Sequence, residues 1–379
     1  MTRSAHFTTI AFSVTNCICF DQRVQKIAAT VSMLDCKVMI IGRHLDSCCD
    51  SDLVPYRTKR FKMIFRKGFL FYKSINLRLF FYLLFHRSDI LVANDLDTLL
   101  PNFLVSKLKG LPLVYDSHEY FTGVPELNNK PFKKWIWKTI ERSIFPHLKF
   151  TMTVSNSVAE QYQNEYGIRP TVIRNCAGTS SDVLPYSHEE LGVPDDHLLL
   201  VFQGGGINID KGGEELIEAI NITSKVSLLI VGSGDVLQSL KGKVNMLNLG
   251  DRVKFIPKLP WPEMIKYTRS ADAGLSLEKD TNLNYRFSLP NKLFDYLSAG
   301  IPVITGSLPE IKNIIEEHDC GIIIPEIIPD EISKAIIKLR DDKDLLNKMK
   351  QNAVVAYKSL NWGKESEKTI EFYKKVLLK

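Results

Sequence analysis

The sequence predicts two doubly wound α/β domains, each built on a parallel β-sheet. The chain has 379 residues, and because a single hydrophobic core stops growing below this size, two domains are the default expectation. Short β-branched runs alternate with longer amphipathic runs from one end of the chain to the other. This alternation is typical of βα units that assemble into a parallel sheet.

The alternation defines the elements of both halves. In the N-terminal half we expect strands at residues 7–14, 36–42, 89–93, 111–116, 150–155 and 170–174. Helices are expected near residues 21–33, 70–85, 97–109, 133–145 and 156–166. In the C-terminal half we expect strands at residues 198–203, 227–232, 253–257, 272–277, 301–305 and 321–325, each followed by a helix.

A segment rich in Ser, Pro, Gly and Asp begins at Asn175 and lacks hydrophobic periodicity, which is typical of an interdomain connection. We therefore predict Rossmann-like domains over residues 1–175 and 176–360. The helical tail at 361–379 either caps its own domain or crosses back to the first one.

The composition bounds the class of protein. Hydrophobic residues make up 45% and charged residues 24%, as in ordinary soluble globular proteins. The seven cysteines are odd in number and lack CxxC spacing, so we expect neither a disulfide framework nor a zinc site, and a reducing cytosol fits best. The first residues lack the apolar core of a signal peptide. The most apolar segment, 69–85, is interrupted by Lys73, Asn76 and Arg78, and its uncharged part is too short to span a bilayer.

A glycine cluster follows the strand expected at 198–203. Gly204, Gly205 and Gly206 are followed by Lys211 and then by a helix. Glycines let backbone N–H groups approach an anion, and the helix N-terminus and the lysine add positive charge. This predicts a diphosphate cradle, and the alternative is a flexible loop with a solvated lysine. The spacing does not match a P-loop.

A second cluster lies on the helix that Pro290 starts and Gly300 ends. Helical spacing brings Asn291, Lys292 and Asp295 onto one face, apart from a buried stripe of Leu293, Phe294 and Leu297. The Asp295 carboxylate is a candidate acceptor for the two hydroxyls of a ribose. Lys292 pairs either with phosphate or with Asp295, and the plainer alternative is a surface ion pair.

Polar residues also follow two strands of the N-terminal half. Asp116, Ser117, His118 and Glu119 end one strand, and Asp95 and Asp97 follow another. Ligands in open α/β sheets bind at this edge. Asp-X-Asp is also a metal-binding pattern, but we favour a role for Asp97 as a helix cap or in repelling misplaced phosphate.

Positive charge is concentrated between Leu53 and Ser88, where nine Lys or Arg and no Asp or Glu occur among ten aromatic residues. This composition suits an element that contacts anionic lipid headgroups, with Arg60, Lys62, Arg66 and Lys67 as the contact residues. The alternative is that the aromatic residues are core and the cations face solvent. No nucleic-acid-binding motif is present.

These clusters, in this order, resemble retaining glycosyltransferases of family 4 with the GT-B fold, particularly bacterial enzymes of surface-polysaccharide assembly. The likeness covers nearly the whole chain and includes CFDQRVQKIA, SDILVANDLDTLLP, LVYDSHEYF, VFQGGGINIDKGGEELIEAI, LIVGSGD and SLPNKLFDYLSAGIPVI.

The resemblance implies two domains facing across a cleft. The C-terminal domain binds the nucleotide-sugar donor, the N-terminal domain binds the acceptor, and the last helix crosses back to the first domain. It implies no metal and no other cofactor. By resemblance, Lys211 binds the diphosphate, Asp295 stands at the second acid of a Glu-X7-Glu motif, and His118 faces the transferred sugar.

The expected sites follow from these assignments. Catalytic residues are His118, Lys211 and Asp295, and Asp95, Asp97 and Glu119 lie on the acceptor side. Donor-binding residues are Gly204, Gly205, Gly206, Lys211, Gly234, Arg286, Ser288, Leu289, Pro290, Asn291, Lys292 and Asp295. The chain departs from the motif at Phe287, which stands where the first acid is expected, and Arg286 is a candidate to restore positive charge at the phosphates.

We therefore expect transfer of a hexose-type residue from a UDP- or GDP-sugar to a saccharide or lipid-linked acceptor, with retention, at the cytoplasmic face of the plasma membrane. The alternatives are an epimerase or hydrolase of nucleotide sugars with the same fold, and a catalytically impaired scaffold subunit of a polysaccharide assembly, which Phe287 motivates.

Overall fold

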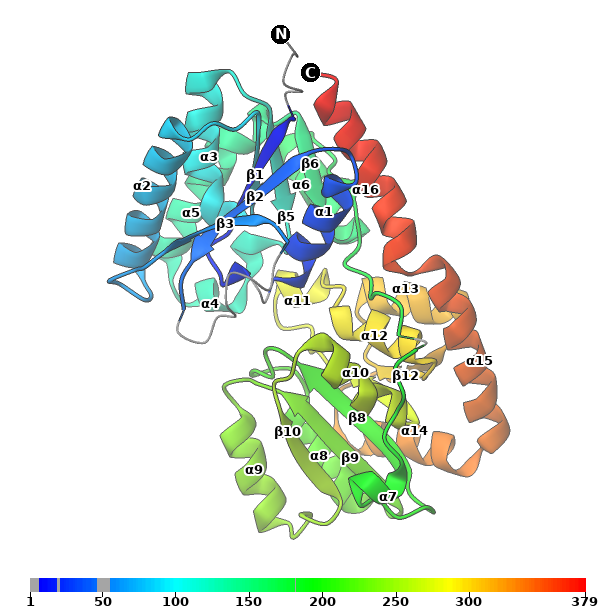
Figure 1. Cartoon of the computed structure of the whole chain (residues 1–379). Coiled ribbons are helices and arrows are strands. Elements are labelled where there is room, and N and C mark those ends of the chain that lie inside the picture. The colour runs from blue at the N-terminus through cyan, green and yellow to red at the C-terminus, as the bar shows by residue number, and fades with distance from the viewer. Residues whose placement is uncertain (1–6, 19–20, 46–54, 181) are drawn as a thin grey trace. The chain divides into compact units, whose positions relative to one another are not determined.

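The computed structural model of the chain describes residues 7–18, 21–45, 55–180 and 182–379. Its contacts divide the chain into two units (Figure 1). The first unit contains Met1–Asn175 and Glu365–Lys379, and the second contains Cys176–Lys364. The division falls where the Ser- and Pro-rich connection begins, and the end of the last helix belongs to the first unit.

The first unit is built on a parallel sheet of seven strands in the order β3-β2-β1-β4-β5-β6-β7. The strands are β1 (Thr9–Ser13), β2 (Lys37–Arg43), β3 (Arg57–Phe61), β4 (Ile90–Asn94), β5 (Leu113–Ser117), β6 (Phe150–Thr153) and β7 (Thr171–Val172). The main helices are α1 (Gln22–Ser32), α2 (Phe69–Phe85), α3 (Leu96–Lys109), α4 (Pro125–Asn128), α5 (Pro131–Ile144), α6 (Asn156–Tyr166) and α16 (Trp362–Leu377). Helices α2, α3 and α5 lie on one side of this sheet, and α1 and α16 lie on the other (Figure 1).

Strand β3 was not predicted. Its sequence is RTKRF, and none of its residues is buried. It lies at the edge of the sheet and pairs only with β2. Edge strands are commonly rich in charge because charge discourages pairing with other chains, so the apolar pattern that marks the inner strands is missing here.

Helix α2 has a buried apolar face and also exposed apolar side chains, so the aromatic residues of this stretch are neither all core nor all exposed. Phe71, Ile75, Leu79 and Leu83 recur every four residues and are buried, and the helix packs against α3. Among the other apolar side chains of the helix, the exposed ones are Phe69, Leu70, Leu77, Phe81 and Phe85. Among the described residues, no helix has both the length and the hydropathy needed to cross a membrane.

The second unit has a parallel sheet of six strands in the order β10-β9-β8-β11-β12-β13. The strands are β8 (Leu198–Gly204), β9 (Val226–Gly232), β10 (Val253–Pro257), β11 (Ala273–Ser276), β12 (Val303–Thr305) and β13 (Gly321–Ile323). The helices are α7 (His188–Leu191), α8 (Gly213–Ile222), α9 (Leu237–Met246), α10 (Trp261–Ser270), α11 (Leu283–Arg286), α12 (Asn291–Ala299), α13 (Pro309–His318), α14 (Pro329–Asp341) and α15 (Lys343–Ser359).

Alternate side chains of β8 enter different cores, because successive residues of a strand point to opposite faces of the sheet. Leu198, Leu200 and Phe202 join a core that includes residues of α8 and α14. Leu199 and Val201 join a second core that includes residues of α12 and α13. Both faces of this sheet are therefore covered, as expected for a doubly wound parallel sheet.

The cysteines differ in one respect from the expectation. Cys36, Cys176 and Cys320 are buried and free, but Cys17 is disulfide-bonded. The absence of paired CxxC spacing did not predict this bond.

Candidate active site

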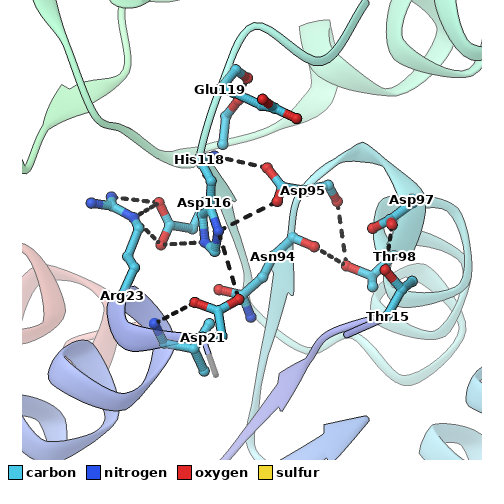
Figure 2. A network of polar contacts seen from close by, with 12 residues as sticks. Thr15, Asp21, Arg23, Asn94, Asp95, Asp97, Thr98, Asp116, His118 and Glu119 are labelled. Carbon is cyan, nitrogen blue, oxygen red and sulfur yellow. Dashed lines mark hydrogen bonds and ion pairs between the residues drawn. The ribbon is translucent and has the colours of Figure 1, made fainter. Parts of the chain in front are cut away.

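A network of charged side chains occupies the edge of the first sheet where β4 and β5 end (Figure 2). The network includes a buried ion pair between Arg23, on α1, and Asp116, on β5, with 2.6 Å between Nη2 and Oδ1. The Asp116 side chain is fully buried and that of Arg23 is 2% exposed. Burial raises the pKa of Asp116, whereas Arg23 and His118 lower it. The lowering is the larger effect, so the pKa of Asp116 lies well below its usual range.

His118 lies on this network with a side chain that is 17% exposed. Its Nε2 is 3.4 Å from Asp116 Oδ2, and its Nδ1 is 3.3 Å from Asp95 Oδ2 and 3.9 Å from Asp21 Oδ2. Burial alone would lower the pKa of His118, but the charges of Asp95, Asp21 and Asp116 outweigh it and raise the pKa to about 10. The three carboxylates therefore favour the protonated ring, which donates hydrogen bonds.

Asp95 is held in a backbone conformation that few residues adopt. Its φ is +60°, a region that is costly for a residue with a Cβ. Two hydrogen bonds fix it there: its backbone N–H donates to the Asp116 carbonyl over 2.9 Å, and its Oδ1 accepts from the His118 N–H over 2.8 Å. Burial is the main cause that raises the pKa of Asp95. The structure thus brings together two of the predicted residues, Asp95 and His118.

Asp97 is not the cap that the sequence offered as one of its two roles. Helix α3 starts at Leu96 after Asp95, and Asp97 lies inside its first turn, so Asp97 is not the cap. Its carboxylate accepts a hydrogen bond of 2.5 Å from Thr15 Oγ1. Burial raises the pKa of Asp97 to about 6, although this hydrogen bond opposes the rise. Among the described residues, no three His, Cys, Asp or Glu side chains are grouped so as to hold a metal ion.

Glu119 follows His118 at the edge of the network. It is partly buried, and its backbone carbonyl accepts a hydrogen bond from Ser117 Oγ over 2.7 Å. This bond fixes the turn that carries His118 away from the end of β5.

A cluster of the opposite charge lies in the second unit. Lys292, on α12, and Lys211, before α8, both contact Glu278, with Nζ to Oε1 distances of 3.0 and 3.6 Å. Burial of Glu278 would raise its pKa, but the two lysines and a hydrogen bond from Ser276 outweigh it and lower the pKa to about 2. Lys211 also lies 4.0 Å from the centre of the Tyr285 ring. The two lysines thus share the carboxylate of Glu278.

The glycines near this cluster serve two purposes. Gly212 caps α8 with φ of +76°, and a Cβ there would lie 2.5 Å from Leu277 Cβ. A Cβ on Gly234 would lie 2.0 Å from the Ile207 carbonyl oxygen. These two glycines are needed for packing. By contrast, a Cβ on Gly205 would contact no atom, so the loop leaves open space beside its backbone, which is consistent with a diphosphate cradle.

Asp295 differs most from the prediction. Its side chain is buried, and its two oxygens accept hydrogen bonds from Trp261 Nε1 over 2.8 Å and from Gln203 Nε2 over 2.9 Å. Lys292 pairs with Glu278 instead, so the proposed pairing of Lys292 with Asp295 is wrong. Helical spacing correctly put both residues near one another but did not reveal that Asp295 points into the protein.

The remaining predicted donor residues surround α11 and the start of α12. Arg286 is exposed and pairs with Asp280 over 2.9 Å. Ser288 Oγ donates to the Tyr285 carbonyl, Leu289 is buried, and Pro290 and Asn291 form the start of α12. Phe287 ends α11. Gly204 is the last residue of β8, and Gly206 lies in the loop that follows.

Two features were missed by the sequence analysis. Glu278 was not singled out, although it follows a predicted strand at the edge where ligands bind. Arg23 was part of a matching segment but had no role assigned, and a charged residue within an otherwise apolar helix face was the available signal.

Two family models match the chain. Residues 22–180 match the family described as Glycosyltransferase Family 4, and residues 187–355 match the one described as Glycosyl transferases group 1. The chain is a glycosyltransferase of the family 4 type. Its two parallel-sheet units have the GT-B fold, as the structural comparisons below show.

Three solved structures share the fold of this chain. Sucrose-phosphate synthase from Thermosynechococcus elongatus has a TM-score of 0.80 at 16% identity and covers 98% of this chain and 99% of that one. WaaG, a glycosyltransferase involved in lipopolysaccharide biosynthesis, has a TM-score of 0.73 at 18% identity, with 95% and 98% covered. Anabaena HepE in complex with UDP and glucose has a TM-score of 0.72 at 15% identity, with 97% and 100% covered.

One curated relative is the chitobiosyldiphosphodolichol beta-mannosyltransferase of Candida glabrata. It is 20% identical to this chain over 292 residues, which make up 68% of this chain. The match spans 63% of the length of that relative.

The charge of His118 gives a first testable prediction. Asp95→Asn should lower the pKa of His118, because it removes the carboxylate nearest to Nδ1. NMR titration of the histidine ring in both proteins measures this, and Asp280→Asn in the second unit is the control. In the wild type the contribution of His118 to the free energy of unfolding is complete below about pH 6.5 and is lost as the pH rises toward 10. A His118 pKa that is equal in wild type and Asp95→Asn would contradict the assignment.

Asp295 gives a second prediction. Asp295→Asn replaces the carboxylate that accepts from Trp261 and Gln203 with an amide. The amide has only one acceptor oxygen, so one of the two donors loses its partner. We expect the second unit to lose about 1–3 kcal/mol of unfolding free energy. Denaturant unfolding measures this, with Asn291→Ala on the exposed side of α12 as the control. Unchanged stability together with weaker nucleotide binding would instead favour direct contact with a ligand.

Proposed function

We propose that this glycosyltransferase transfers a hexose-type residue from a UDP- or GDP-sugar to a saccharide or lipid-linked acceptor, with retention of configuration, in the assembly of cell-surface polysaccharide. The observation that carries the proposal is the pair of lysines on Glu278 in the second unit. The other assignments follow from the charges around it and around His118.

The lysine pair is suited to a leaving diphosphate. Lys211 and Lys292 are 18% and 11% exposed, so solvent screens their charge less than that of surface lysines. Glu278 holds both ammonium groups in place before a ligand arrives, and the N-terminus of α8 adds partial positive charge. These groups stabilise the negative charge that develops when the sugar leaves the diphosphate, and we propose that they do so without a metal ion.

The comparisons support a nucleotide-sugar donor. HepE was solved with UDP and glucose and also with UDP-glucose, and WaaG acts in lipopolysaccharide biosynthesis. The name of the Candida glabrata relative includes a saccharide linked to a lipid diphosphate. We therefore favour a uridine diphosphate donor and a lipid-linked acceptor for this chain.

We assign Asp295 to positioning rather than to direct contact with the ribose. Its oxygens already accept from Gln203 and Trp261, which join α12 to β8 and α10. This network fixes the helix that presents Lys292. Asp295 thus acts on the donor through the position of that lysine.

We propose that His118 orients the transferred sugar. The carboxylates around His118 raise its pKa, which favours donation of a hydrogen bond to the donor sugar over action as a general base. Asp116 is paired with Arg23, and Asp97 accepts from Thr15. We propose that the acid cluster orients the sugar and the acceptor hydroxyl, and that it stabilises positive charge at the anomeric carbon.

We also propose that the first unit contacts the cytoplasmic face of an anionic membrane. Lys62, Arg66 and Lys67 are exposed, and Arg60 is partly exposed on β3. Five apolar side chains of α2 are exposed beside them. Cations next to exposed aromatic rings are the composition of interfacial elements.

The function is tested by an assay of nucleoside diphosphate release from UDP- and GDP-sugars, with and without acceptor. Lys211→Ala should weaken UDP binding and transfer by about 1.5–3 kcal/mol, because a charge-assisted contact to the diphosphate is lost. Lys334→Ala, an exposed lysine of the same unit, is the control. Activity should persist in EDTA, and NMR of the product should report the anomeric configuration of the donor.

The outcomes of this assay separate the alternatives. Release that does not depend on acceptor indicates a hydrolase or epimerase, and no release with intact UDP binding indicates an impaired subunit. Wild-type kinetics in Lys211→Ala would remove this lysine from the site.

Membrane contact is tested by co-sedimentation with anionic liposomes. The wild type should bind, and salt should release it, because the Debye length is about 8 Å at physiological ionic strength. Replacing Arg60, Lys62, Arg66 and Lys67 with Ser should lower binding without changing the melting temperature. Equal binding by the two proteins would show that these cations only face solvent.

A further inference from the structure

The first unit contains a cavity that the assignments above do not use. It has a volume of about 230 Å³ and is lined by Arg43, His44, Leu45, Lys62, Met63 and Arg66. Three of these residues are cations and none is a carboxylate. Among the described residues, neither Arg43 nor Lys62 forms an ion pair with an acid. Such a lining favours an anionic ligand.

Arg43 is prepared to bind an anion. Its guanidinium lies 5.0 Å from the centre of the Phe71 ring, and its Nη1 donates to the Arg66 carbonyl over 3.2 Å. These contacts fix the plane of the group. A guanidinium held in this way loses less freedom when it binds an anion.

The cavity lies at the same edge of the sheet as His118. Arg43 ends β2 and Lys62 follows β3, just as Asp95 follows β4 and His118 follows β5. The strand order places β1 and β4 between β2 and β5, so three strand spacings separate the ends of β2 and β5, or about 14 Å. A ligand of several sugar rings has the length to reach both.

Aromatic side chains connect the two places. Tyr72 contacts Phe71 beside Arg43 and Trp137 on α5, with ring centroids 5.1 and 5.2 Å apart. Trp137 contacts Phe121, three residues after His118, at 5.3 Å. Tyr72, Trp137 and Phe121 are partly exposed. Rings of this kind pack against the apolar faces of ligands.

Charges from both places act on Tyr72. Burial is the main cause that raises the pKa of its hydroxyl. Asp97 and Glu119, from the acid cluster, raise it further, whereas Arg43 lowers it. Tyr72 therefore lies within electrostatic reach of both the cavity and the acid cluster.

Exposed apolar side chains lie between the cavity residues and helix α2 and in the first turn of that helix. Ile64 is 82% exposed, Phe69 is 64% exposed, and Phe65 and Leu70 are also exposed. Ile64 and Phe65 come directly after Met63, which lines the cavity. A cavity lined by cations and followed in the chain by exposed apolar side chains matches a ligand in which a phosphate is joined to a hydrocarbon chain.

We propose that this cavity binds the phosphate or diphosphate of a lipid-linked saccharide acceptor, with its sugar rings along Tyr72, Trp137 and Phe121 and its lipid chain against Ile64 and Phe69. This inference rests on the proposed function and deepens it by assigning residues to the phosphate, the sugar rings and the lipid chain of that acceptor. It makes Arg43 and Lys62 specificity residues for the acceptor, distinct from the residues that hold the donor diphosphate in the second unit.

The experiment uses farnesyl diphosphate as the probe and farnesol as its phosphate-free counterpart. Both are titrated calorimetrically into the full chain, with saturating UDP so that the lysine pair of the second unit is occupied. The variants are Lys62→Gln and Arg43→Gln, and melting curves report whether each folds. Lys67→Gln is the matched control, because it removes the same charge from the same surface but does not line the cavity.

Farnesyl diphosphate should bind the wild type at least about ten-fold more tightly than farnesol, and Lys62→Gln should weaken its binding by about ten-fold or more. Lys67→Gln should bind within about two-fold of the wild type. Equal weakening by Lys62→Gln and Lys67→Gln would overturn the inference in favour of general attraction to anionic headgroups. Absence of binding to the wild type would also overturn it. This experiment measures binding and not transfer. It therefore tests the cavity even where the proposed transferase activity is not found.

Discussion

The buried ion pair between Arg23 and Asp116 is the interaction on which the first unit's site depends. Burying two charges is costly unless each is paired and hydrogen-bonded, and here the remaining donor of Arg23 is satisfied by the Ile173 carbonyl over 2.6 Å. The pair thereby ties α1 to β5 and to the segment after β7. It also keeps Asp116 ionised, which fixes the charge of His118 and, through the His118 backbone, the strained conformation of Asp95.

The two clusters have opposite electrostatic designs. In the first unit, Asp21, Asp95 and Asp116 surround the His118 ring, and Asp116 also pairs with Arg23. In the second unit, two ammonium groups share the single carboxylate of Glu278. An acid-rich site suits the positive charge of a sugar that is losing its leaving group, and a lysine-rich site suits the departing diphosphate. Each cluster is assembled within its own unit by residues that follow parallel strands.

The parts of the fold that the sequence predicted are those that rest on hydrophobic periodicity. Twelve strands were expected and found within a few residues, and β3 was missed because a charged edge strand such as RTKRF has no apolar alternation. The edge of each sheet correctly located His118, Asp95 and Lys211. Spacing along a helix could not tell whether Asp295 points outward or inward, because that depends on Gln203 and Trp261, which lie 92 and 34 residues away in the sequence. Glu278 was missed for a related reason, since its role depends on two lysines from separate segments.

The course of the chain has a consequence for the architecture. The backbone leaves the first unit at Asn175 and returns at Glu365, so the second unit is an insertion between two parts of the first. Phe372 and Tyr373 of the returning helix contact Phe150 and Phe12, and Glu365 accepts from the Arg174 backbone N–H. A fragment that stops at Asn175 therefore lacks part of its own hydrophobic core. During synthesis, the second unit therefore has all of its residues before the first unit does. The first unit can complete its folding only after the whole of the second has been made.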